Sequence, residues 1–262
     1  MTSADGARGR RCGQNAGMRS PGDDESLILG LINEFWVAVE RGIPREMAAL
    51  MCAEEAEQFL DNVPDPDYDE SSGEPIGEPT FEVSGLRLFG DVAFARIVHA
   101  PDNVATLFFR YETGRWTVCA DADEDLSLEQ LEDDVWPTMP ADASGLMRTV
   151  HELRRKPIGR LTDEDVRRLL QQNEGVDVLL PRVLHQLQWN PLAGGDLFPG
   201  DLLVATLRVG QEHWRRDPVA VTRIRIVIDE VRDLGDLTEH GAPHEEIWNR
   251  ITDFLIDLPG NN

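Results

Sequence analysis

Few residues of this 262-residue sequence have the type and spacing that catalysis or metal binding requires. His240 and His244 lie four positions apart, the spacing with which two histidines on one face of a helix bind zinc. Gly241 and Pro243 lie between them and predict a loop in place of a helix, so we expect no zinc site. His99 is the only histidine before residue 120, and the sequence offers no convincing acid–base partner for it.

The three cysteines, Cys12, Cys52 and Cys119, give no paired framework and no CxxC spacing. They are typical of reduced thiols in a cytoplasm, and we expect Cys52 to be a small buried hydrophobic residue and not a nucleophile. The sequence also contains no nucleotide-binding loop, no GxSxG motif and no HExxH motif. It therefore predicts no enzyme activity, no metal and no cofactor.

Acidic side chains dominate the charge: 49 Asp and Glu against 25 Lys and Arg give a net charge of −24. This charge argues against nucleic acid and anionic membranes as partners and is compatible with a basic protein partner. Acidic surfaces also keep proteins soluble, so this second interpretation stays open. No apolar run approaches the roughly 20 residues of a membrane helix, and the N-terminus lacks the apolar core of a signal peptide. We expect a cytoplasmic protein.

Residues 61–82 contain eight of the acids and four prolines, and they contain no Lys or Arg. The prolines break any regular element, so we expect a mobile acidic loop. Carboxylates in such a loop are potential calcium ligands, but the regular EF-hand spacing is missing.

The N-terminal half predicts an α+β domain over residues 23–120. Residues 1–22 show no hydrophobic period and are expected to be disordered. Residues 25–60 have a helical pattern, with a break at Gly42 and a new helix at Pro44. Residues 81–120 alternate like antiparallel strands, with turns at 90–91 and 113–114. The segment FFRYETGRWTVC after GDVAFARIV resembles the NTF2-like (cystatin-like) folds, in which a curved sheet wraps a long N-terminal helix.

The C-terminal half predicts an all-α domain over residues 138–262, preceded by an acidic connector at 121–137 in which Ser127 caps a short helix with Leu128 and Leu131. Thr162 and Asp165 fit a variant capping box at the start of a helix, and Asn173 with Gly175 predict its end. Residues 176–187 follow with one apolar stripe. Residues 219–231 fit both a strand and a helix, and the preceding Pro218 together with the length favours the helix.

Residues 126–214 resemble the CdiI-type immunity proteins of contact-dependent growth inhibition systems. The matching residues, in order, are Leu128, Trp136, Pro137, His151, Leu153, Arg154, Lys156, Pro157, Leu161, Asn173, Gly175, Leu180, Pro181, Asn190, Pro191, Leu192, Gly195, Asp196, Pro199, Gly200, Asp201, Leu202, Leu203 and Trp214. The resemblance covers about a third of the chain, and no short motif in it is chemically diagnostic.

The resemblance implies a bacterial protein that binds a cognate toxin and blocks its active site. Such toxins are frequently nucleases with a basic substrate groove, which suits an acidic inhibitor. We expect the contact around Glu174, Asp177, Asp196 and Asp201; capping and turn formation are the alternative roles of these acids. The basic run Arg154–Lys156 is either a partner contact or the solvated end of a helix.

A second function from a different class stays open. In this alternative, the N-terminal domain is an NTF2-like small-molecule binder or enzyme, with the helical part as an accessory. A sizeable closed cavity with converging polar groups would favour this alternative, and a cavity filled by Phe35, Phe94 and Phe108 would favour protein binding alone.

Overall fold

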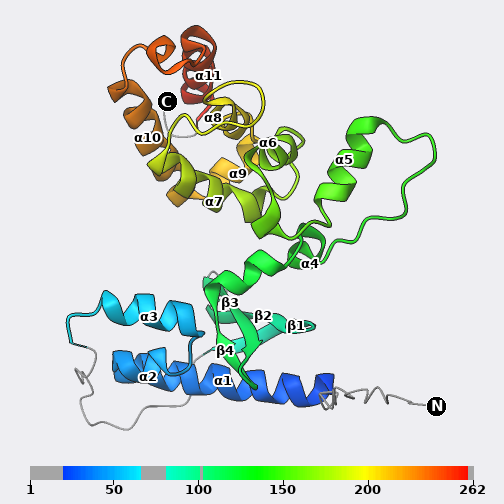
Figure 1. Ribbon diagram of the computed structural model, residues 1–262, viewed down its shortest axis with the longest axis vertical. Helices are drawn as coiled ribbons and strands as arrows, with labels where there is room; N and C mark the ends of the chain where they lie inside the picture. Colours follow the sequence, from blue (N-terminus) through cyan, green and yellow to red (C-terminus); the bar gives the residue numbers. More distant parts are fainter. Residues whose placement is uncertain (1–19, 66–80, 101–102, 259–262) are drawn as a thin grey trace, which may run out of the picture. The chain divides into compact units, whose positions relative to one another are not determined.

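The computed structural model describes residues 20–65, 81–100 and 103–258 (Figure 1). The chain divides into two compact units, Met1–Ala120 (unit 1) and Asp121–Asn262 (unit 2). Unit 1 combines helices with an antiparallel sheet, and unit 2 is helical, as the α+β and all-α predictions require. None of the described helices is long and apolar enough to cross a membrane.

Three helices open unit 1: α1 (Pro21–Arg41), α2 (Pro44–Ala48) and α3 (Ala53–Asp61). The predicted disordered segment 1–22 was too long, because α1 begins at Pro21; its residues 1–19 lie outside the described part. The Ser20 hydroxyl caps the helix by accepting from the Asp23 amide (3.3 Å), and Pro21 fits the first turn. Gly42, with φ of 65°, ends α1 as predicted.

Four strands then form one antiparallel sheet in the order β1-β2-β3-β4: β1 (Glu82–Phe89), β2 (Val92–Ala100), β3 (Asn103–Glu112) and β4 (Arg115–Val118). The two predicted turns join β1 to β2 and β3 to β4, with positive φ at Gly90, Thr113 and Gly114. The predicted mobile loop 61–82 is helix at its start and strand at its end, while residues 66–80 lie outside the described part.

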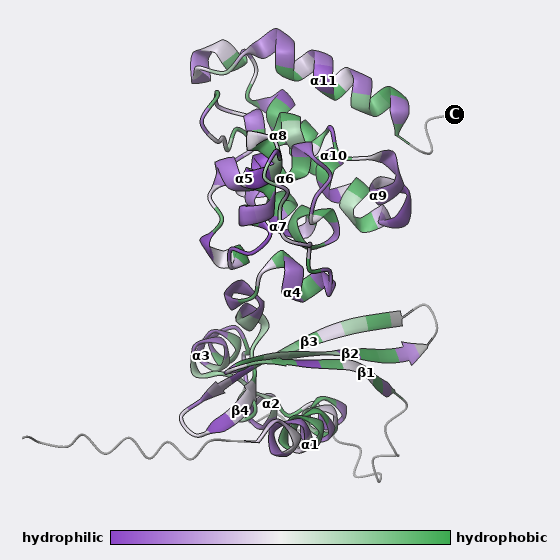
Figure 2. Ribbon diagram, turned by 90° about the vertical axis from the view of Figure 1, so that its right-hand side faces the viewer, coloured by the Kyte–Doolittle hydropathy of each residue, from purple (hydrophilic) through white to green (hydrophobic). Residues whose placement is uncertain are grey.

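The core of unit 1 lies between α1 and one face of the sheet. Ile28 and Ile32 pack with Ala95, Ile97 and Phe109, all of them almost fully buried. Figure 2 shows much of β2 and β3 in the colour of hydrophobic residues. The core residues Ala95 and Ile97 are two positions apart in β2, because every second residue of a strand faces the helix.

Unit 2 consists of short helices. They are η1 (Ala120–Asp125), α4 (Leu128–Glu132), α5 (Gly145–Leu153), η2 (Ile158–Arg160), α6 (Asp163–Gln171), α7 (Val176–Trp189), α8 (Asp201–Thr206), α9 (Gln211–Arg216), α10 (Pro218–Asp233), η3 (Leu237–His240) and α11 (His244–Asp257). Residues 219–231, whose pattern fits both a strand and a helix, are helical, as predicted. The predicted capping box is present: Thr162 and Asp165 exchange hydrogen bonds of 3.2 and 3.1 Å.

The predicted acidic connector, residues 121–137, is not an exposed linker. Leu126 and Leu128 are buried in unit 2, and Ser127 starts α4 with a capping box. Asp123 forms an ion pair of 2.6 Å with Arg182 of α7. The short helix predicted to start at Ser127 is therefore present as α4, whereas the burial of Leu126 was not predicted.

One buried cluster extends through unit 2. The stripe of α7 is buried as predicted and consists of Val176, Leu179, Leu180, Val183, Leu184 and Leu187. Figure 2 shows hydrophobic and hydrophilic stretches alternating along α11, whose Ile247, Ile251 and Phe254 are buried. Leu146, in the first turn of α5, is 50% exposed, whereas Val150 and Leu153 of the same helix are buried.

Candidate functional site

Arg154 is the centre of a buried ion-pair network in unit 2. Its side chain is 2% exposed, and its Nη1 lies 2.8 Å from carboxylate oxygens of both Glu132 and Glu174. Its Nη2 lies 3.1 Å from a carboxylate oxygen of Asp134, and its guanidinium stacks 4.6 Å from the ring centroid of Trp136. Burial raises the pKa of Glu132, although Arg154 opposes this shift. Neither interpretation of the basic run applies to Arg154, which stabilises the unit from inside.

The neighbours of Arg154 are also paired. Arg155 Nε lies 3.2 Å from a carboxylate oxygen of Glu129, and Lys156 Nζ lies 2.6 Å from one of Asp165. These pairs join α4, the end of α5 and α6. The basic run therefore connects helices.

A second charged cluster fixes the loop between α7 and α8. Glu164 accepts from Arg167 Nε (2.6 Å) and Nη2 (2.7 Å), from Arg168 Nε (2.5 Å) and from the Asp196 amide (3.2 Å). The hydrogen bonds from Arg167 are the main reason that the pKa of Glu164 is lowered to about 2. A Cβ atom at Gly195 would lie 2.5 Å from Glu164, so this close approach requires glycine.

Two of the four predicted contact residues, Asp201 and Glu174, bind other groups of unit 2; Asp201 is buried and Glu174 is 24% exposed. Asp201 is 2% exposed and accepts from the amides of Gly195 (2.5 Å) and Leu197 (3.0 Å). Its carboxylate thus binds the preceding loop and holds it against the start of α8. Asp201 does not cap α8, whose N-cap is Gly200. Glu174 belongs to the Arg154 network. Both side chains have structural partners, in agreement with the alternative role that the sequence left open for such acids.

The other two predicted residues are exposed. The Asp177 side chain is 70% exposed and lies 2.8 Å from Nδ1 of His213. Asp196 is exposed, and its backbone amide is bound by Glu164. The structure does not bring the four acids together in one site.

Asp196 borders a surface that contains exposed hydrophobic side chains. We define the α6 N-terminal surface as Asp163, Gln186, Trp189, Asp196 and Leu197. Gln186 donates to both carboxylate oxygens of Asp163 (2.9 and 3.0 Å), and Trp189 lies one turn further along α7. Asp196 is tied to Glu164, the residue after Asp163, and Leu197 follows it.

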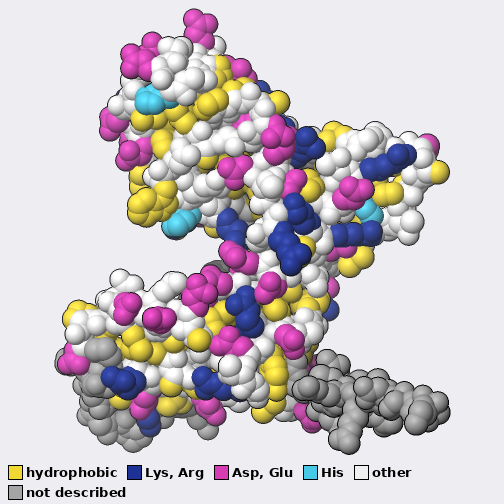
Figure 3. All heavy atoms as spheres, viewed as in Figure 1, with side chains coloured by type: hydrophobic (Ala, Val, Ile, Leu, Met, Phe, Trp, Pro, Cys, Tyr) yellow, Lys and Arg dark blue, Asp and Glu magenta, His cyan; other side chains and the backbone are white. Residues whose placement is uncertain are grey.

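Trp189 is 82% exposed and Leu197 is 62% exposed. The prediction from sequence missed both residues. A signal was present for Trp189, which lies outside the buried stripe of α7 and so had to face away from the core. Figure 3 shows acidic side chains interspersed with hydrophobic ones on the face of unit 2 in view. Large exposed hydrophobic side chains with a polar rim are typical of a protein interface.

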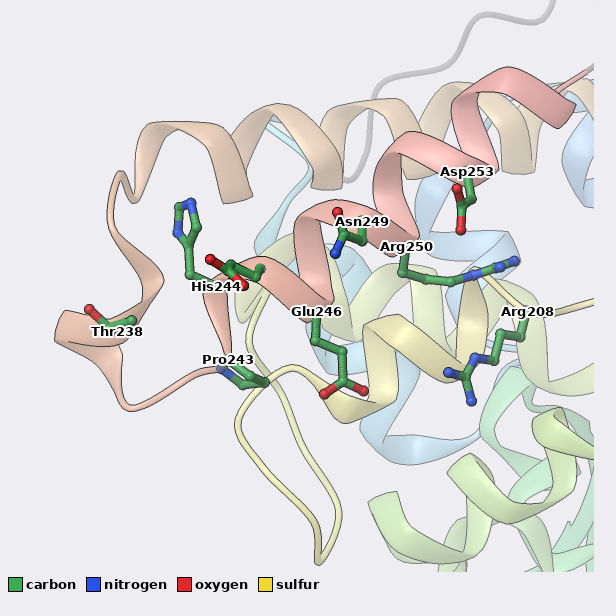
Figure 4. Close-up of a pocket in the computed structure, with 9 residues that line it drawn as sticks. Arg208, Thr238, Pro243, His244, Glu246, Asn249, Arg250 and Asp253 are labelled. Carbon is green, nitrogen blue, oxygen red and sulfur yellow. The ribbon is translucent and has the colours of Figure 1, made fainter.

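An open pocket of about 790 Å³ lies beside α11, lined by Arg208, His244, Glu246, Asn249, Arg250 and Asp253 among others (Figure 4). Arg250 donates to the Leu207 carbonyl, and burial lowers its pKa, with Arg208 adding to the effect. Arginines and carboxylates line the pocket together, so their charges do not select one kind of ligand.

The two histidines considered for zinc lie in different elements. His240 ends η3, and His244 is the first residue of α11. His244 Nδ1 accepts from the Leu237 amide (3.2 Å), so this nitrogen already has a partner.

Within the described part of the chain, one group of three side chains has potential metal-ligating atoms close together. Cys52, Glu55 and Cys119 have these atoms within 4.8 Å of one another. Burial raises the pKa of both thiols and therefore opposes the thiolates that a metal requires. Proximity alone does not make this group a metal centre. Both cysteines are free and buried, as expected for Cys52.

Comparison with known proteins identifies one family. Residues 130–224 match the family model of CDI immunity proteins. Neither the curated proteins nor the solved structures gave a match. The matched segment includes the Arg154 network, the Glu164 cluster and the α6 N-terminal surface. Over residues 130–224 the chain is thus similar to CDI immunity proteins, which confirms the resemblance seen in its sequence.

Proposed function

We propose that this protein is an immunity protein that binds and neutralises the toxin of a contact-dependent growth inhibition system. The match of residues 130–224 to CDI immunity proteins carries the proposal. Such proteins generally inhibit toxins by binding and not by catalysis. The charged clusters of unit 2 fit a role in binding and not in catalysis, because their side chains form ion pairs with one another.

We further propose that the α6 N-terminal surface contacts the toxin. Trp189 supplies a large rigid anchor, and tryptophan is enriched among the residues that dominate binding energy. Leu197 adds apolar area, and Asp196 adds an exposed negative charge at the rim. Asp177 remains a candidate at a separate position, paired with His213.

The net charge of −24 supports a basic toxin, such as a nuclease with a phosphate-binding groove. An acidic inhibitor in a bacterial cytoplasm would associate rapidly with such a groove through long-range attraction. Unit 1 has the order of an NTF2-like fold, three helices followed by an antiparallel sheet, and we propose that likeness for it. The alternative function, small-molecule binding, would reside in unit 1 and does not depend on the toxin-binding surface.

The experiment compares Asp196→Ala with Asp201→Ala, using the full chain and the toxin domain encoded in the neighbouring reading frame. Asp196→Ala should keep the melting temperature and slow association with the toxin, since Asp196 is exposed. Asp201→Ala should lower the free energy of unfolding by about 1–3 kcal/mol, because the amides of Gly195 and Leu197 lose their acceptor, the almost fully buried Asp201 carboxylate.

Melting temperature and association rate are measured on the same preparations. A toxin domain that is neither bound nor inhibited by the unmodified chain would contradict the proposed function. Slower association only for Asp201→Ala would contradict the placement of the surface.

A further inference from the structure

The outer face of α10 carries two large apolar side chains. Val219 is 66% exposed and Ile226 is 45% exposed, whereas Ile224 and Ile228 of the same helix are buried. Val219 and Ile226 are seven positions apart, close to two turns of helix, so they lie on one face with the exposed Thr222 between them. Figure 1 shows α10 on the opposite side of unit 2 from α5. We define the α10 surface as Val219, Thr222, Arg223, Ile226 and Glu230.

Two opposite charges lie along one edge of this surface without an ion-pair partner. Arg223 donates to the Pro181 carbonyl (3.5 Å), and it forms no ion pair within the described part of the chain. The Glu230 carboxylate has no hydrogen bond or ion pair among the described residues. Arg223 and Glu230 are also seven positions apart and therefore share one edge of the helix, but about 10 Å separates them along its axis. They cannot pair with each other in one molecule.

The charges along α10 are arranged against the helix dipole. Its first turn holds no acid, and Glu230 and Asp233 lie in its last turn. Arg232 of the same turn already pairs with Asp229. Acids stabilise the start of a helix and bases stabilise its end, so this arrangement is unfavourable for α10 alone. A second helix that runs in the opposite direction alongside α10 would bring basic side chains to these acids.

The beginning of α10 belongs to a basic segment of an acidic chain. Residues 208–225 contain five arginines and two acids, whereas the whole chain has a net charge of −24. The arginines are Arg208, Arg215, Arg216, Arg223 and Arg225. A second copy of the chain offers the matching acidic region at the end of its own α10. The α10 surface is therefore complementary to itself when two helices lie antiparallel.

We propose that two copies of this chain associate through antiparallel contact of their α10 helices. A twofold axis near Ile226 places Arg223 of each copy beside Glu230 of the other, which gives two equal ion pairs. Ile226 of one copy then contacts Ile226 of the other between these pairs, and Val219 extends the apolar contact on either side. The α10 surface shares no residue with the α6 N-terminal surface, so this self-association is independent of the proposed toxin binding.

The dimer should be weak. A helix of 16 residues is about 24 Å long, so one pair of helices buries a small interface. Sedimentation equilibrium of the full chain over about 5 to 500 µM covers the range expected for such an interface. Salt of about 0.15 M limits the repulsion between two chains of like net charge. The unmodified protein should change from monomer to dimer within this range.

Two variants with the same change of charge locate the interface. Ile226→Glu should abolish the dimer, because it places two like charges at the twofold axis. Ile256→Glu is the matched control, since Ile256 is 73% exposed on α11 of the same unit, and it should leave the dissociation constant unchanged. The melting temperature shows that both variants are folded.

Exchange of the two charges tests the antiparallel arrangement. Arg223→Glu and Glu230→Arg should each weaken self-association about tenfold or more, because two contacts between like charges replace two ion pairs. A mixture of these two variants should form a heterodimer with a dissociation constant within about threefold of the unmodified value, because each variant supplies the charge that the other lacks. A purely structural role of either residue would not produce this rescue.

Three results would overturn the proposal. The first is an unmodified protein that stays monomeric at the highest concentration, and the second is a folded Ile226→Glu variant that still dimerises. The third is a mixture of Arg223→Glu and Glu230→Arg that associates no better than either variant alone.

Discussion

Several side chains through which this sequence resembles CDI immunity proteins stabilise unit 2 from inside. Arg154 joins the acids of α4 to Glu174, and Asp201 closes the loop between α7 and α8. Gly195 permits the close approach of that loop to Glu164. The resemblance thus largely describes architecture. Choice of partner must depend on exposed side chains, of which Trp189 does not contribute to the resemblance at all.

The Glu164 cluster predicts a specific dependence of stability on pH. The pKa of Glu164 is lowered to about 2 from an ordinary value of 4.5, so the folded state favours its carboxylate. This contribution to stability is complete above pH 4.5 and is lost as the pH falls from about 4.5 to about 2. Glu164→Gln should therefore be less stable than the unmodified chain at pH 6, and the difference should shrink toward pH 2.

Urea denaturation midpoints at several pH values between 6 and 2 measure this effect. Glu239→Gln is the control, because Glu239 is exposed and no hydrogen bond of its carboxylate is seen among the described residues. A constant difference between Glu164→Gln and the unmodified chain over this range would contradict the assigned role.

The surroundings of single acids could not be predicted from the sequence. Asp196, in the loop before α8, and Asp201, the first residue of α8, are only five positions apart, yet Asp196 is exposed and Asp201 is 2% exposed. The difference arises because the loop folds back and points the Gly195 and Leu197 amides at Asp201. A turn of this kind leaves no periodic pattern in the amino-acid sequence.

Packing between elements depends on Gly175 at the start of α7. Its φ is 64°, and a Cβ atom there would lie 2.5 Å from the buried side chain of Leu128. Gly235, after α10, has a similar φ of 73° but no atom within 4 Å of its Cβ position. Substituting alanine at each of these two glycines therefore separates the free-energy cost of a left-handed backbone from the cost of disturbed packing.

Gly235→Ala should cost about 1–2 kcal/mol of unfolding free energy, the price of a left-handed alanine. Gly175→Ala should cost about 1–3 kcal/mol more, because Leu128 must move within a packed core. Chemical denaturation of both variants measures the two values. Equal destabilisation would show that α4 does not pack on the start of α7 as described.

Helices with a complete apolar stripe and a cap could be predicted from the sequence. The buried face of α7 and the Thr162–Asp165 capping box are examples. Segments with few apolar residues could not, as the burial of Leu126 within an acidic run shows. Their burial depends on distant partners, such as Arg182 for Asp123 and Pro157 for Ser127, which local patterns do not reveal.

At the scale of the whole molecule, the boundary between the units can be tested with two fragments. We propose that residues 121–262 fold by themselves and melt cooperatively. A fragment of residues 138–262, which starts after the predicted connector, lacks Leu126, Leu128 and two of the acids paired with Arg154, Glu132 and Asp134. Loss of the two leucines alone should cost about 3–6 kcal/mol.

Circular dichroism melting of both fragments gives the answer. We expect the shorter fragment to be unfolded or to melt far below the longer one. Equal melting temperatures would mean that residues 121–137 contribute nothing to unit 2. A longer fragment without a cooperative transition would mean that unit 2 requires unit 1.

The most direct test of the proposed function is the binding kinetics of the full chain with its cognate toxin domain. Trp189→Ala should weaken binding about 30-fold or more, mainly through faster dissociation, as for an anchor worth at least about 2 kcal/mol. Ile256→Ala is the matched control, since Ile256 is 73% exposed in the same unit but lies outside residues 130–224. Raising the salt from 0.1 to 1 M shortens the Debye length from about 10 to 3 Å and should slow association of every variant. A 30-fold loss for Trp189→Ala with an unchanged Ile256→Ala would support the account. Unchanged affinity for Trp189→Ala, or weaker binding only for Ile256→Ala, would contradict it.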